Sequence, residues 1–187
     1  MPAPTATELD QLTGTYTIDP SHSRLGFVAR HAMVTKVRGA FNDFSGTVEI
    51  DADDPARSSA QVTIQVASVD TRSDDRDAHL RSDDFFATDQ HPEMRFVSSS
   101  VQPLDQSSFR VSGDLTIRDV TKPVTFDLEY EGTAVDPFGN TRVGFEGQTV
   151  VNRKDWGLEW NAALETGGVL VSEKITLEFE VSAVKDA

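Results

Sequence analysis

The sequence predicts an all-β domain in which antiparallel strands form a sandwich or a barrel. Apolar and polar residues alternate in many short segments, which is the pattern of strands with one buried face. Turn-forming residues separate these segments, and only one segment has a helical pattern. The chain has 187 residues, which is enough for one well-buried domain and short for two.

The alternating segments cover most of the chain and give about eight or nine strands. In a typical one, Val62, Ile64 and Val66 alternate with polar neighbours. Further segments lie at residues 15–18, 25–31, 48–50, 96–102, 109–117, 124–130, 143–153 and 175–181. No internal repeat or linker divides the chain. We therefore expect a flexible N-terminal segment over residues 1–12 and a single domain over residues 13–187.

The stretch Tyr16–Gly46 contains the most informative strand. Alternate side chains of an extended segment share one face, so Leu25, Phe27 and His31 belong to one row. An apolar row that ends in a histidine suits a barrel wall with a polar mouth. A second apolar row ends in the same way, at Arg153.

One segment breaks the alternation and predicts a short helix over residues 73–81. Ser73 can cap it, and the acids that follow favour the positive end of the helix dipole. The Asp-rich stretch Asp70–Asp84 lacks the ligand spacing of a calcium loop, so we interpret its acids as a solvated helix face. The four histidines show no short metal-ligand spacing, and no metal site is predicted.

The net charge is −14 and the sequence pI is near 4.5. Such a chain repels phosphate backbones, which argues against nucleic acid as a partner, and it repels anionic membrane surfaces. No stretch has the roughly 20 apolar residues of a membrane span, so no stable membrane insertion is expected. The N-terminus lacks the pattern of a secretory signal peptide, and we expect a cytoplasmic location. The absence of cysteine excludes disulfides and thiol catalysis.

Several motifs in order resemble the YceI-like family. The opening is Y-T-I-D-x-x-H-S-x-x-x-F-x-x-x-H, followed by V-x-G-x-F-x-x-F-x-G. The middle carries H-L-R-S-D-D-F-F and H-P-E-M-R-F, and the later part carries G-D-L-T-I-R-D-V-T-K-P-V, N-R-K-D-W-G and I-T-L-E-F-E-V. The resemblance runs from about Tyr16 to Val184. Two residues depart from the resemblance. Trp156 stands where the family more often has phenylalanine, and Asp119 stands where it often has glycine.

The resemblance implies a single antiparallel lipocalin-like β-barrel that holds a long isoprenoid or another aliphatic chain, often as a homodimer. A barrel of about eight strands can hold one small ligand or be filled by its own side chains. Small inward residues, among them Gly113 and Gly147, either leave space for a ligand or mark bulges and bends. The predicted apolar wall, or its support, is Phe27, Phe41, Phe44, Phe126, Phe145 and Trp156.

His31 and Arg153 are the candidates for binding a ligand head group at the mouth of the barrel. The alternative is a histidine satisfied by the backbone and an arginine in solvent at a strand end. Asp19, Ser21 and His22 have the residue types of a hydrolase triad. They are too close in sequence to form the required relay, so Asp19 and Ser21 are predicted to cap a turn.

The predicted function is binding of an isoprenoid or fatty-acid-like lipid by a carrier, storage or sensing protein. No nucleophile motif, cofactor loop or metal set is recognisable, so neither catalysis nor a cofactor is predicted. Two alternatives stay open. One is an enzyme that acts on a lipid-like substrate inside the barrel with His31 as base, and the other is a stress or interaction protein with a filled barrel.

Overall fold

The computed structural model describes residues 12–165 and 167–187. Almost all regular structure in these ranges is β-strand. The strands are β1 Gly14–Ile18, β2 Arg24–His31, β3 Thr35–Phe41, β4 Phe44–Ile50, β5 Ser59–Gln65, β6 Val69–Asp70, β7 Glu93–Pro103, β8 Ser108–Ile117, β9 Val120–Val135, β10 Thr141–Asn152 and β11 Lys174–Lys185. The helices are α2 Asp74–Arg81 and the short 3₁₀ segments η1 Pro20–His22, η2 Pro55–Arg57, η3 Val66–Ser68 and η4 Arg153–Trp156.

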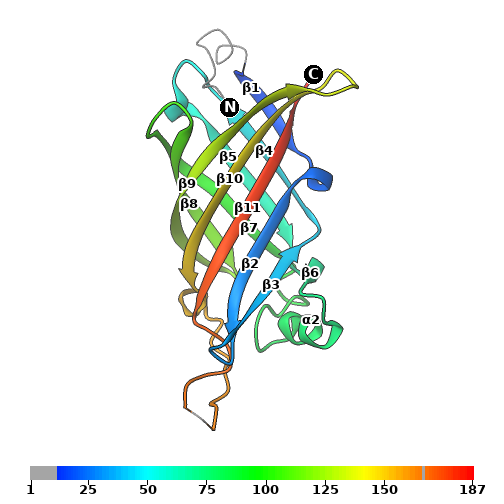
Figure 1. Cartoon of the computed structure of the whole chain (residues 1–187), viewed down its shortest axis with the longest axis vertical. Helices are drawn as coiled ribbons and strands as arrows, with labels where there is room; N and C mark the ends of the chain where they lie inside the picture. The colour runs from blue at the N-terminus through cyan, green and yellow to red at the C-terminus, as the bar shows by residue number, and fades with distance from the viewer. Residues whose placement is uncertain (1–11, 166) are drawn as a thin grey trace.

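The strands form one closed antiparallel barrel (Figure 1). β1 pairs with β4 on one side and β11 on the other, which joins the two edges of the sheet. β1 and β2 both pair with β11 and lie one after the other along it, so together they fill one strand position. In the same way, β3 and β4 together fill the next position, where β3 pairs with β2 and β4 with β1. β5 and β6 fill the third, where β5 pairs with β4 and β6 with β3. The first six strands thus occupy three positions and β7–β11 the other five. This confirms the prediction of an eight-stranded barrel.

Local hydrogen bonds stabilise the breaks between paired strands. At the first break, the Asp19 carboxylate accepts from the Ser21 backbone N–H at 3.0 Å and from its hydroxyl at 2.7 Å. Asp19 thereby begins η1 and has the turn-capping role predicted for it. The side chains of Asp19, Ser21 and His22 do contact one another, but His22 uses the same Nδ1 atom toward the Ser21 hydroxyl at 3.0 Å and toward Asp19 at 2.8 Å, so no relay is formed. At the second, the N–H of Asp43 donates to the Ser68 hydroxyl oxygen at 3.0 Å, which holds the β3–β4 break against η3.

Helix α2 lies at the end of the barrel where the sheet splits. β6 pairs with β3, whereas β7 pairs with β5, and α2 is inserted between β6 and β7 in the sequence (Figure 1). Ser73 accepts from the Arg76 N–H and caps the helix as predicted. The prediction of a solvated acidic face is wrong for Asp77, which is buried and accepts from the Thr71 N–H and hydroxyl at 2.9 and 2.6 Å.

The buried side chains form clusters within the barrel and at the α2 end. One contains Tyr16, Phe44 and Val143, and another packs Phe85 and Trp156 against strand residues. Leu12 is also buried, and its carbonyl accepts from the Tyr16 hydroxyl at 2.8 Å, so this residue belongs to the barrel. The rest of the predicted flexible segment 1–12 lies outside the described residues. No helix in the described ranges is long and apolar enough to cross a membrane.

Candidate ligand cavity

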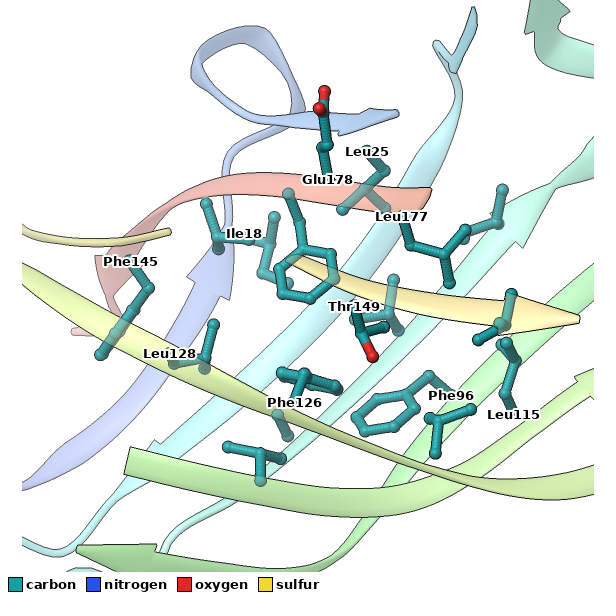
Figure 2. Close-up of a pocket in the computed structure, with 18 of the residues that line it drawn as sticks. Ile18, Leu25, Phe96, Leu115, Phe126, Leu128, Phe145, Thr149, Leu177 and Glu178 are labelled. Atoms are coloured by element: carbon teal, nitrogen blue, oxygen red, sulfur yellow. The ribbon is translucent and has the colours of Figure 1, made fainter. Parts of the chain in front are cut away.

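The interior of the barrel contains a cavity of about 470 Å³. Its wall is formed by the inward rows of the strands, and most lining residues are apolar. The side chains of Phe96, Phe126 and Thr149 converge on this space, whereas the Glu178 carboxylate points away from it (Figure 2). That carboxylate lies within 4 Å of the guanidinium groups of Arg24 and Arg38 instead. The cavity is therefore an apolar chamber in which few polar groups face a ligand.

Aromatic rings form much of this wall and contact one another. The ring centroids of Phe126 lie 5.5 Å from Phe96 and 4.8 Å from Phe179. Phe27 and Phe41 lie 5.6 Å apart on the neighbouring strands β2 and β3. Several of these rings are only partly buried although they point into the barrel, because they border the hollow space. Such a wall offers apolar contact along the barrel and leaves room for another molecule.

The inward glycines do not themselves form the cavity. A Cβ atom at Gly147 would lie 2.5 Å from the Phe179 ring, and one at Gly113 would lie 2.6 Å from the Phe96 ring. Phe27 covers Gly39 in the same manner. These glycines therefore let phenylalanine rings lie flat across the neighbouring strand, as in other sheets where an aromatic ring covers a glycine. The predicted free space is not found at Gly113 or Gly147, whereas the predicted bulge is found beside Gly113, because the register of β7 shifts between Ser98 and Ser100 opposite this residue.

The predicted wall residues have different positions. Phe27, Phe41, Phe126, Phe145 and Trp156 line the cavity. Phe44 is buried in the cluster around Tyr16 and is not part of the lining. The indole N–H of Trp156 donates to the Leu115 carbonyl at 2.9 Å, which fixes this ring at the α2 end of the cavity.

Arg153 is buried, and its guanidinium holds together the segments that close the α2 end. Nε donates to the Ser172 carbonyl at 2.8 Å, Nη1 to that of Leu158 at 2.6 Å and Nη2 to that of Val171 at 3.3 Å. Burial lowers the pKa of this guanidinium. These bonds use three of its five N–H groups. Arg153 also lines the cavity, so binding of a head group by the other two stays a prediction.

His31 lies at the same end but outside the cavity. Its side chain is exposed, and its backbone forms a bridge with Val171. Val171 itself lines the cavity, whereas His31 does not. The alternation that placed His31 in the inner row ends here, because Ala32 and Met33 adopt left-handed backbone conformations and turn the chain.

The other end of the cavity has polar residues that the sequence analysis did not select. They come from the loops that join β4 to β5 and β7 to β8, at the end opposite α2 (Figure 1). The lining there includes Asp51, Ser58, Asp105 and Gln106. The Ser107 backbone N–H, which donates to Asp105 at 2.8 Å, lowers the pKa of that carboxyl. The only sequence signal was the turn composition of both loops.

This geometry defines a class of protein, an antiparallel barrel built around an apolar internal cavity. A family model described as a YceI-like domain matches residues 16–183. A UPF0312 protein of Staphylococcus aureus strain MSSA476 is 40% identical over 169 residues, which cover 90% of this chain and 95% of that protein. The chain belongs to the YceI-like family.

Solved structures have the same fold. The Campylobacter jejuni YCEI protein is 31% identical, with a TM-score of 0.73 over 84% of this chain and 90% of that one. BcnA of Burkholderia cenocepacia is 25% identical, with a TM-score of 0.78 over 88% of this chain and 98% of that one. A polyisoprenoid binding domain from Saccharophagus degradans is 19% identical, with a TM-score of 0.71 over 91% and 98% of the two chains, which shows similarity of fold.

Proposed function

We propose that the barrel binds one long-chain isoprenoid or similar amphiphilic lipid in its cavity and acts as a carrier, storage or sensing protein. The observation that carries this proposal is the apolar cavity of about 470 Å³ inside a closed barrel. Ligand cavities in proteins usually measure about 300–1,000 Å³ and combine an apolar wall with a few polar groups. The cavity of this chain has both properties.

The wall chemistry favours a hydrocarbon chain. Each buried methylene contributes about 0.8 kcal/mol, so a long chain binds tightly with few polar contacts. At the end opposite α2, the polar lining residues lie near solvent and can form hydrogen bonds with a head group. The name of the Saccharophagus degradans domain describes polyisoprenoid binding by that protein, and the shared fold is consistent with a similar ligand here. A homodimer is a further part of the proposal and rests on the family resemblance alone.

The enzymatic alternative has no comparable observation in its favour. It needs a base inside the barrel, and His31, the residue considered for that role, is exposed and outside the cavity lining. We therefore propose binding without conversion of the ligand. Recovery of a chemically changed lipid after incubation, with the change lost in His31→Gln, would contradict this part of the proposal.

The test is organic extraction of the purified protein followed by mass spectrometry. We expect a long-chain lipid at about one molecule per chain. After removal of this lipid, the folded protein should bind a polyprenol or a fatty acid again, as measured by titration calorimetry. A folded protein that carries no lipid and binds neither probe would show that the cavity has another role.

A further inference from the structure

The β2–β3 hairpin has a charge opposite to that of the chain. From residue 20 to residue 42 the sequence contains four arginine and lysine residues and no acid, although the chain has a net charge of −14. Three of these residues, Arg30, Lys36 and Arg38, lie in the half of the hairpin nearer its tip. The hairpin is thus a local basic surface on an acidic protein.

Arg24 and Arg38 lie within 4 Å of the Glu178 carboxylate, but the arrangement of the other two charges of the hairpin does not favour folding. Arg30 and Lys36 are directly opposite one another across β2 and β3, and both are exposed. Like charges in this position destabilise a sheet. Lys174 begins the adjoining strand β11 and is also exposed. Across residues 12–165 and 167–187, no carboxylate forms an ion pair with Arg30, Lys36 or Lys174.

Exposed apolar side chains lie beside these charges. At the hairpin tip, Met33 is 59% and Val34 is 77% exposed, and Val169 of the neighbouring loop is 38% exposed. The tip is fixed to that loop, because the Ala32 N–H donates to the Leu170 carbonyl at 2.7 Å. Both segments extend beyond the barrel at its α2 end (Figure 1). The hairpin tip is thus an apolar protrusion with basic residues behind it, beside a loop that extends further and also contains the exposed Glu165.

We propose that this docking surface, composed of Met33, Val34, Val169, Arg30, Lys36 and Lys174, binds peripherally to an anionic lipid bilayer. The apolar tip enters the interface between head groups and acyl chains, and the basic side chains contact anionic head groups. The net charge predicts repulsion from such a bilayer. At physiological ionic strength, however, charges are screened over about 8 Å. The charges close to the contact therefore determine whether the protein binds, and the net charge of the whole chain matters less.

A second copy of the chain suits this surface less well. In a two-fold interface the same patch occupies both sides, which would place Arg30 and Lys36 against their own equivalents. A convex tip with single exposed side chains also lacks the broad contact area of a stable protein interface. A bilayer has neither limitation, since its head groups supply the opposite charge and its surface adapts to a protrusion.

Docking in this orientation brings the α2 end of the cavity to the bilayer. Val171 lines the cavity and pairs with His31, the last residue of β2 before the tip. The docking proposal goes beyond ligand binding and does not depend on it. A vesicle assay measures attachment of the surface, whereas lipid extraction measures occupancy of the cavity, so the two proposals fail independently.

The first experiment uses the absence of cysteine in the chain. Val34→Cys is labelled with an environment-sensitive fluorophore and mixed with vesicles of phosphatidylcholine, with or without phosphatidylglycerol. Phe138→Cys is the matched control, since Phe138 is 87% exposed on the β9–β10 hairpin beside Asp136, at the opposite end. We expect a blue shift for the label at position 34 alone, only with phosphatidylglycerol, and its loss at high salt.

The second experiment changes one charge at a time. Arg30→Glu and Lys36→Glu should weaken co-sedimentation with phosphatidylglycerol vesicles by about tenfold or more. Arg57→Glu makes the same charge change in η2, in a loop at the far end, and should leave binding nearly unaltered. Thermal melts confirm that each variant is folded.

Three results would overturn the proposal. The unmodified protein fails to bind anionic vesicles at physiological ionic strength, or the labels at positions 34 and 138 respond equally, or the three charge variants lose binding equally. In lipid-free buffer, sedimentation velocity should give the same mass for the unmodified protein and for Val34→Ser. A change of mass would identify the tip as a contact between two copies and would also reject docking to a bilayer.

Discussion

Arg142 and Asp19 are 123 residues apart in the sequence, and their Nη1 and Oδ2 atoms lie 2.8 Å apart in the barrel. The Nε of Arg142 also donates to Asp136 at 2.8 Å. One guanidinium therefore connects the break between β1 and β2 to the β9–β10 hairpin. The Ser21 hydroxyl and then Arg142 hold the pKa of Asp19 well below its usual range. The Asn140 N–H, with help from Arg142, lowers the pKa of Asp136 to about 2.

These contacts predict how acid stability changes in Arg142→Gln. A carboxyl with a lowered pKa in the folded state stabilises the protein above its ordinary pKa of 3.8, and this stability is lost as the pH falls toward about 2. We expect the variant to be less stable than the unmodified protein at neutral pH. The difference in melting temperature should shrink as the pH falls through this window.

Arg110→Gln is the control for that measurement. Arg110 contacts Asp127 on the outer surface, where both side chains are about half exposed, and exposed ion pairs contribute little. Thermal melts at closely spaced acidic pH values should therefore show a small effect for Arg110→Gln. Equal pH dependence in the two variants would contradict the role assigned to Arg142.

Arg153→Met tests whether the buried guanidinium closes the barrel end or binds a head group. Loss of its three bonds leaves carbonyl groups without their donors, and each such loss costs about 1–3 kcal/mol. For a closing role we expect a lower melting temperature and weaker binding of polar-headed lipids and hydrocarbons alike. For head-group binding, only the polar-headed lipid should lose affinity, by about 10- to 150-fold. Titration calorimetry with matched probes separates the two roles.

The alternation of apolar residues predicted the barrel because one buried face per strand determines this pattern. It also selected Phe126 and Phe145, which line the cavity. It could not separate them from Phe44, since a wall residue and a core residue have the same periodicity. The exposed position of His31 and the buried position of Arg153 depend on the turn at Ala32 and Met33 and on the 3₁₀ segment η4 that begins at Arg153. Hydrogen bonds formed by residues distant in the sequence decide such positions, and local spacing does not report them.

Phe145→Asp tests the wall directly. Phe145 borders the cavity, and its ring lies 5.8 Å from that of Tyr130. A carboxylate in this position would face the ligand chain without a compensating partner, so lipid affinity should fall strongly. Phe138→Asp introduces the same group at a side chain that is 87% exposed and should leave affinity unchanged. Both variants are first examined by thermal melting, and unchanged affinity in folded Phe145→Asp would remove this ring from the binding wall.

Two glycines three positions apart on β10 give the last prediction. A Cβ at Gly147 would lie 2.5 Å from the Phe179 ring and 2.9 Å from the Asp127 carbonyl oxygen. The ring can move, but the carbonyl belongs to the neighbouring strand β9, so the sheet itself would have to shift. Such overpacking usually costs about 1–3 kcal/mol, and we expect Gly147→Ala to lower the free energy of unfolding by this amount.

Gly144→Ala is the matched variant, because a Cβ there would have its nearest contact at 3.6 Å, from the Glu131 side chain. This is an ordinary van der Waals distance, so stability should change little or rise slightly as the unfolded chain loses freedom. Urea unfolding of the two variants gives the comparison. The movement of Phe179 should also reach the cavity, since its ring lines the wall and contacts Phe126. Gly147→Ala should therefore reduce lipid affinity as well as stability. Equal stability of the two alanine variants would show that the Phe179 ring and the β9 backbone adapt without cost.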